Sequence, residues 1–180
     1  MSPRPCAAPS YFLLAERNDA VVHGDSFVVG LTDADLIQHA RDLIQLGPDS
    51  AGSPILFADI AEGADGINRD LLKPGAPQWS WHVTSVGGFS DFGIELLDGW
   101  PSFVESDVPG WIRNTNPTQA PPPAPQTGQI GFWSYTVVKE LPSDYPETIP
   151  VIPLPATVPV TVGLMALTVM NPRFRRAIMR

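Results

Sequence analysis

The sequence has few of the side chains on which catalysis and metal binding most often depend. Its 180 residues include one cysteine, Cys6, and three histidines, His23, His39 and His82. One cysteine can form neither an internal disulfide nor a cysteine-based zinc site. The histidines show no H-x-H or H-x-x-x-H spacing, and the chain has no G-x-S-x-G, P-loop or G-x-G-x-x-G motif. We therefore expect no metal and no cofactor.

Basic residues are scarce outside the C-terminus. The chain has 11 Lys and Arg against 19 Asp and Glu, a formal net charge of −8. Arg173, Arg175, Arg176 and Arg180 lie in the last eight positions, so residues 1–172 carry 7 basic and 19 acidic residues, a net charge of −12. An acidic body repels phosphate backbones, so we expect no nucleic-acid partner.

Proline, by contrast, is abundant and unevenly placed. Of 21 prolines, 7 fall in residues 1–100 and 14 in residues 101–180. Proline removes a backbone donor and blocks helix interiors, which excludes a helix bundle. The prolines predict an irregular surface loop over residues 113–129 and an extended linker over residues 142–156. Residues 1–10 are expected to form a flexible N-terminus.

Short apolar runs separated by turn residues predict an α+β domain over residues 11–141. We expect a mostly antiparallel sheet of five to six strands, with one main helix and one short helix. The strand over residues 89–97 would place Phe92, Ile94 and Leu96 on one face. The strands are predicted at residues 11–15, 26–31, 55–60, 79–83, 89–97 and 130–141.

Two capping boxes indicate where the helices begin. Thr32, with Asp35 three residues later, is predicted to cap the main helix, which ends at Gly47-Pro48. Apolar residues between them recur on one helical face. Ser102, with Glu105, is predicted to start the short helix, which Pro109-Gly110 would end.

Tryptophan supplies the first candidate binding residues. Exposed indoles can stack on sugar rings, although tryptophan more often packs in cores. Trp81 and Trp133 lie in predicted strands among apolar neighbours, which favours the core. Trp100 and Trp111 flank the short helix and are better candidates for exposure.

A few polar residues supply the remaining candidates. His82 could act as a base with Glu95 or Asp98, although a structural histidine and surface carboxylates are the simpler interpretation. The acidic loop DIAEGADG, which contains Asp59 and Asp65, suggests weak calcium binding, but it does not match a calcium-loop motif.

Four segments of the body carry a resemblance to a known kind of domain. They are FVVGLTDADLIQHARDLI, WSWHV, FGIELLDGWPSFVE and FWSYTVVKEL, within residues 11–141. Together they resemble a poorly characterised domain of calmodulin-binding-protein-related and bacterial secreted proteins. The resemblance implies a fold unit and no established activity, with signature positions at Trp81, His82, Glu95, Asp98 and Trp133.

The C-terminus carries a second resemblance, in three consecutive parts. They are a P-L-P-A motif (Pro153, Leu154, Pro155, Ala156), the uncharged apolar residues 157–170, and the arginines Arg173, Arg175 and Arg176. This order resembles the PEP-CTERM-type sorting signal in its V-P-L-P-A variant. The resemblance implies recognition by an exosortase, a membrane-embedded protease-transpeptidase, with residues 157–180 forming an apolar helix and a basic end at the membrane.

Three functions remain open at this point. The first is a non-enzymatic exported bacterial domain at the cell envelope or surface, transiently anchored in the membrane, that binds glycans or matrix components. The second is an exported hydrolase that uses His82 with Glu95 or Asp98. The third is a soluble intracellular domain whose apolar tail packs against it. Residues 1–10, MSPRPCAAPS, do not resemble a secretory signal peptide, so either no signal exists or it lies upstream of Met1.

Overall fold

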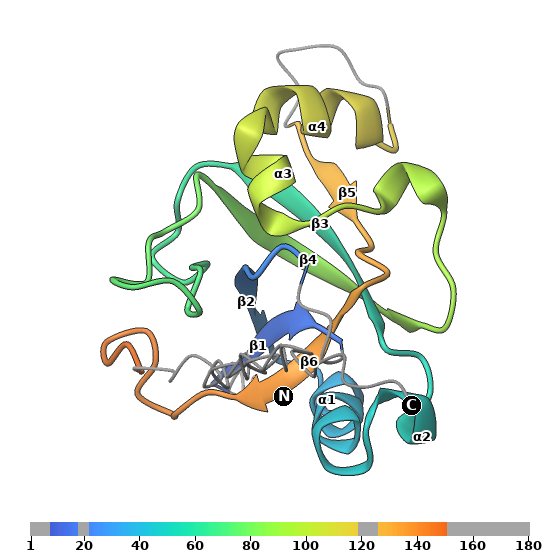
Figure 1. Ribbon diagram of the computed structural model, residues 1–180, viewed down its shortest axis with the longest axis vertical. Helices are drawn as coiled ribbons and strands as arrows, with labels where there is room; N and C mark the ends of the chain where they lie inside the picture. Colours follow the sequence, from blue (N-terminus) through green and yellow to red (C-terminus); the bar gives the residue numbers. More distant parts are fainter. Residues whose placement is uncertain (1–7, 18–21, 119–125, 151–180) are drawn as a thin grey trace, which may run out of the picture.

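Six strands form two separate sheets in the computed structural model, which describes residues 8–17, 22–118 and 126–150 (Figure 1). One sheet has the order β2-β1-β6 and the other the order β4-β3-β5, and all neighbouring strands are antiparallel. The α+β class and the antiparallel pairing are confirmed, whereas the prediction of one sheet of five to six strands is wrong. The strands are β1 (Ser10–Glu16), β2 (Ser26–Leu31), β3 (Ile55–Glu62), β4 (Trp81–Ser90), β5 (Gly128–Ile130) and β6 (Tyr135–Glu140).

The second sheet arises because the apolar run predicted as one strand over residues 130–141 is divided. Ile130 in β5 pairs with Ala58 in β3, whereas Tyr135 in β6 pairs with Glu16 in β1. Between them the backbone turns, and the Tyr135 amide donates to the Phe132 carbonyl. A Cβ at Gly131 would lie 2.7 Å from the Phe57 ring, so only glycine lets the chain pass this close. One apolar run therefore supplies an edge strand to each sheet.

The main helix, α1 (Ala34–Leu46), lies where the sequence predicts it, but its cap is a different residue. The Asp33 side chain, and not Thr32, accepts hydrogen bonds from the amides of Asp35 and Leu36, at 2.9 and 3.1 Å. At the other end Gly47 adopts φ 84° and donates to the Leu43 carbonyl, which ends the helix as expected. The four-residue helix α2 (Pro48–Ala51) follows directly.

The predicted short helix is two helices, α3 (Pro101–Ser106) and α4 (Val108–Thr115). Trp100 is the N-cap of α3, so the predicted start at Ser102 is wrong. Pro109 and Gly110 do not end a helix, because they lie in the first turn of α4, where proline is tolerated. The Asp107 side chain accepts from the Gly110 amide at 3.0 Å and fixes this turn. The irregular loop predicted from residue 113 accordingly begins after Thr115.

The strand predicted over residues 89–97 is also wrong. Strand β4 ends at Ser90, which pairs with Ile55, the first residue of β3. Beyond this point β3 offers no further partner, and the chain leaves the sheet to form the 3₁₀ helix η1 (Glu95–Leu97). Leu97 is buried, whereas the side chains expected on one strand face are exposed: Phe92 by 73%, Ile94 by 57% and Leu96 by 59%.

The core lies between the two sheets and is closed at opposite ends by helices. Figure 1 shows α3 and α4 beside β3 and β5, and α1 and α2 at the β6 end of the molecule. The largest cluster of buried side chains draws on both sheets and on α1 and α4. A smaller cluster includes Leu13, Val28 and Tyr145. Residues 142–150, the first part of the predicted linker, therefore pack on the domain through Tyr145.

The predicted sorting segment lies outside the described residues. This applies to the P-L-P-A motif, to the apolar helix expected from residue 157 and to the terminal arginines. Within the described ranges, every helix is too short or too polar to cross a membrane.

Candidate functional site

Three aromatic side chains stack against one another at the surface beside α3. The His23 and Trp100 rings are nearly parallel, with centroids 4.0 Å apart and an interplanar angle of 6°. The Trp100 and Phe103 rings are 4.8 Å apart at 26°. His23 is exposed, Trp100 is half-buried and Phe103 is 47% exposed. We call His23, Trp100 and Phe103 the aromatic row.

Further ring contacts connect the aromatic row to the core. Phe103 meets Trp111 edge to face at 5.8 Å, and Trp111 meets the buried Phe132 at 6.2 Å. The Trp111 Nε1 donates to the Gln129 carbonyl at 2.9 Å. A Cβ at Gly99 would lie 2.9 Å from the Trp111 ring, so this position requires glycine. Such aromatic pairs contribute about 0.5–1.5 kcal/mol each beyond their burial, which makes the row a rigid surface.

A carboxylate at the end of β1 holds the segment that carries His23. Glu16 accepts hydrogen bonds from the backbone amides of Val22, His23 and Gly24, at 3.0, 3.0 and 3.1 Å. Gly24 has φ 67°, a left-handed conformation that favours glycine. Glu16 therefore positions His23 through the backbone and leaves its ring free to stack on Trp100.

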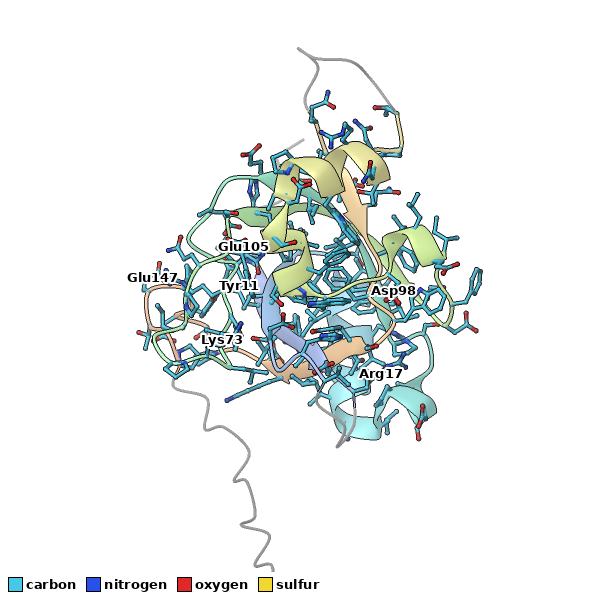
Figure 2. The ribbon with its side chains drawn as sticks, turned by 45° about the horizontal axis from the view of Figure 1, so that its top comes forward. Tyr11, Arg17, Lys73, Asp98, Glu105 and Glu147 are labelled. Carbon is cyan, nitrogen blue, oxygen red and sulfur yellow. The ribbon has the colours of Figure 1, made fainter. Side chains whose placement is uncertain are left out.

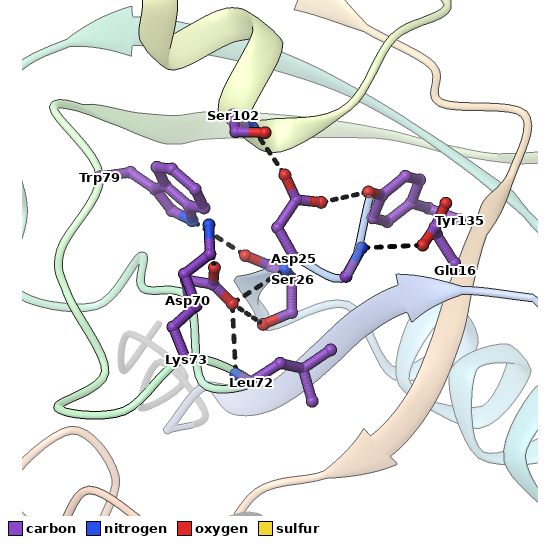
Figure 3. Close-up of polar contacts among 10 residues, drawn as sticks. Glu16, Asp25, Ser26, Asp70, Leu72, Lys73, Trp79, Ser102 and Tyr135 are labelled. Atoms are coloured by element: carbon purple, nitrogen blue, oxygen red, sulfur yellow. Dashed lines mark hydrogen bonds and ion pairs between the residues drawn. The ribbon is translucent and has the colours of Figure 1, made fainter. Parts of the chain in front are cut away.

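A buried carboxyl group holds α3 in place (Figure 3). Asp25 is fully buried and accepts hydrogen bonds from the Tyr135 hydroxyl and, at 2.9 Å, from the Ser102 amide in the first turn of α3. Burial raises the pKa of the Tyr135 hydroxyl above its ordinary range, and the hydrogen bond to Asp25 raises it further. Asp25 thus ties the start of β2 to β6 and to the helix that carries Phe103.

Side chains from the 63–80 loop cover the open edge of β2 below this anchor. Asp70 accepts from the amide and hydroxyl of Ser26, at 3.1 and 3.0 Å, and Asn68 accepts from the Val28 amide at 3.1 Å. Lys73 forms an ion pair with Asp70 at 3.1 Å. Asn68 also donates to the Trp81 carbonyl in the other sheet. These contacts satisfy edge amides that would otherwise be free to pair with another chain.

Two of the predicted site residues, Trp81 and His82, lie at the start of β4 with different surroundings. Trp81 has no exposed surface and packs against Phe27 and Trp79, so we remove it from the candidate binding surface. His82 is half-buried, and its Nδ1 donates to the Gly63 carbonyl at 2.6 Å. This bond fixes the ring against the turn after β3.

Glu95 and Asp98 lie elsewhere, on η1 and directly after it. Glu95 is exposed, and Asp98 accepts from the Trp133 amide at 2.8 Å. The segment that carries them follows Ser90, the last residue of β4, whereas His82 is near its first residue. The described hydrogen bonds of His82 and Asp98 therefore lead to different parts of the fold, and none joins them.

The acidic loop is organised by its own backbone. Asp65 accepts from the amides of Ile67 and Asn68, both at 2.8 Å. Asp59 accepts from the Ser85 hydroxyl at 2.7 Å and from the Gln129 side chain at 3.0 Å. Over the described ranges of the chain, no group of three or more ligating side chains converges as a metal would require.

Of the predicted binding residues, the structure brings Trp100 and Trp111 together through Phe103. Sequence reasoning missed His23 and Phe103. Phe103 follows Trp100 by three residues, a spacing that places two side chains on one helical face and could have identified it. Nothing in the local sequence around His23 indicates that it stacks on a residue 77 positions away.

The fold and this surface define a small α+β domain whose buried polar groups serve its architecture and whose aromatic surface is open to a ligand. A family model described as the BP-74 N-terminal domain matches residues 8–144. The chain therefore belongs to the BP-74 N-terminal domain family, broadly in line with the resemblance of its body to calmodulin-binding-protein-related sequences. Searches of curated proteins and of solved structures gave no match.

Proposed function

We propose that this chain is a non-enzymatic, exported bacterial domain that binds neutral glycans at the aromatic row. The observation that carries the proposal is the stacking of His23, Trp100 and Phe103 at the surface, with two of the three rings exposed. Flat aromatic faces bind the C–H faces of sugar rings, and a rigid row loses little entropy on binding. The acidic body favours uncharged sugars over polyuronates, which it repels.

The carboxylates around the row support this choice of ligand. Glu16 holds the His23 segment, and Glu105 on α3 accepts from the Ser80 amide at 2.9 Å. Carboxylate oxygens accept hydrogen bonds from sugar hydroxyls, whereas they oppose an anionic ligand. The hydrolase alternative has less support, because His82 hydrogen bonds to Gly63 while Asp98 hydrogen bonds to Trp133.

The test is a titration of the purified chain with cellohexaose, chitohexaose and an alginate hexamer, followed by tryptophan fluorescence and calorimetry. We expect one or both neutral sugars to bind and alginate not to bind. Phe103→Ala and His23→Ala should weaken binding about tenfold, since each removes a stacking surface. Phe92→Ala is the matched control, because it removes an exposed aromatic ring outside the row. Equal affinities of the row variants and the control would refute the proposal.

Export and anchoring form the second part of the proposal. The support is the order of the P-L-P-A motif, the apolar residues 157–170 and the arginines, which resembles an exosortase signal. We expect cells to remove the C-terminal part, and Pro155→Ala with Ala156→Asp to prevent this. Mass spectrometry of the mature extracellular protein provides the measurement, and an intact Arg180 would contradict the proposal.

A further inference from the structure

Three exposed apolar side chains lie together on the segment between β4 and α3. Phe92 is 73% exposed, Ile94 57% and Leu96 59%. Among the large apolar side chains of the described residues, only Val22 and Leu46 are exposed to a similar degree, and they lie on other segments. We call Phe92, Ile94 and Leu96 the apolar strip. Such a grouping on a protein surface commonly marks an interaction site.

The backbone turns the strip outward. A Cβ at Gly93 would lie 2.6 Å from the Trp133 Nε1 and 3.2 Å from the Phe57 ring, so this position faces the body of the domain. Ile94 is extended, with φ −100° and ψ 141°, and neighbours in extended chain point to opposite sides. Phe92 and Ile94 therefore point away from the body. The Asp98 bond to the Trp133 amide and the Leu97 bond to Gly131 fix the far end of the segment.

Acidic side chains alternate with the apolar ones. Asp91 and Glu95 are exposed within the segment, and Asp98 follows it. One basic residue, Arg17, lies close by, since its guanidinium donates to the Trp133 carbonyl while Asp98 accepts from the Trp133 amide. Figure 2 shows Arg17 and Asp98 on the same side of the molecule. The strip is therefore an apolar surface with a local excess of negative charge.

We propose that the apolar strip binds an extended polypeptide segment in which apolar side chains alternate with Lys or Arg. Apolar side chains of the partner would cover Phe92, Ile94 and Leu96, and its cations would pair with Asp91 and Glu95. A second copy of the chain fits poorly, because it would oppose like charges across the contact. Anionic lipid is repelled for the same reason, and surface-binding membrane segments are typically rich in Lys and Arg.

The test uses a fluorescently labelled short peptide of alternating lysine and valine, with lysine–serine and glutamate–valine peptides as controls, and measures anisotropy with the full chain. We expect only the lysine–valine peptide to bind, and more weakly at high salt. Phe92→Ser with Ile94→Ser should weaken it about tenfold, and Asp91→Asn with Glu95→Gln severalfold. Leu46→Ser is the matched control, since Leu46 is also 57% exposed and lies on α1. These exposed positions change folding stability little.

Several outcomes would overturn the proposal. One is equal binding of the lysine–valine peptide by wild type and by the Phe92→Ser, Ile94→Ser variant, and another is equal binding of the lysine–serine peptide. Dimers in sedimentation that Phe92→Ser abolishes would assign the strip to a second copy. Pelleting with phosphatidylcholine vesicles that Phe92→Ser abolishes would assign it to a lipid surface. The proposal is independent of glycan binding, because His23→Ala should leave peptide affinity unchanged.

Discussion

The buried contact between Asp25 and Tyr135 gives the most quantitative prediction. Asp25 has no exposed surface, and its two described partners are the Tyr135 hydroxyl and the Ser102 amide. Asp25→Ala leaves both donors buried without their acceptor, and Tyr135→Phe leaves the carboxyl group with one donor fewer. A hydrogen bond to a charged group contributes about 1.5–3 kcal/mol, and an unsatisfied buried group costs about 1–3 kcal/mol.

These values lead to an expected order of effects on the free energy of unfolding. Tyr135→Phe should lower it by about 1.5–3 kcal/mol, since one hydrogen bond is lost. Asp25→Ala should lower it by more, about 2–5 kcal/mol, because two donors lose their acceptor and a cavity forms. The double variant should be less destabilised than the sum of the two, with a coupling of about 1–3 kcal/mol.

Urea unfolding of the four proteins, followed by circular dichroism, measures this cycle. The matched control is Tyr11→Phe, since Tyr11 is half-buried and packs edge to face on Tyr145 outside this network. Additive effects, with a coupling of less than about 0.5 kcal/mol, would show that the two groups do not interact as described. Near-ultraviolet circular dichroism should also change in Asp25→Ala, since α3 carries Phe103 and follows Trp100.

Three further predictions concern other parts of the fold. Asn68→Ala should lower the free energy of unfolding by about 1–3 kcal/mol, since it leaves the Val28 amide without its acceptor; it should also promote aggregation, measured by light scattering, because it opens the β2 edge. Unchanged stability and scattering would contradict this role. Burial raises the pKa of Tyr145 to about 12, so the folded state keeps a proton that the unfolded state loses near pH 10. This stabilisation is present below about pH 10 and is lost as the pH rises toward 12, so Tyr145→Phe should make urea stability fall less steeply over that range. A slope identical to wild type would contradict the burial effect. Gly99→Ala should displace the Trp111 ring and change tryptophan fluorescence, whereas Gly87→Ala, whose added Cβ would lie 3.7 Å from its nearest neighbour, should not; equal spectra for both would refute the close approach at Gly99.

Local sequence patterns determined the α+β class and most of the elements. The strand Ser26–Leu31 has the predicted bounds, and the helix ends at Gly47 as expected. Both depend on interactions between residues close in sequence, namely alternation of apolar side chains and helix capping. The same reasoning explains why Trp100 could be recognised as a surface candidate, because it lies directly before a helix.

Only the tertiary structure decided how these elements combine. The run over residues 130–141 has the pattern of one strand, yet it serves two sheets because Gly131 passes close to Phe57. The segment of Phe92, Ile94 and Leu96 has strand-like alternation, yet it leaves the sheet because β3 has no residues left to pair with. His23 reaches Trp100 through the position that Glu16 imposes. In each case the deciding contact joins residues far apart in sequence, whereas the patterns read from the sequence describe only neighbours.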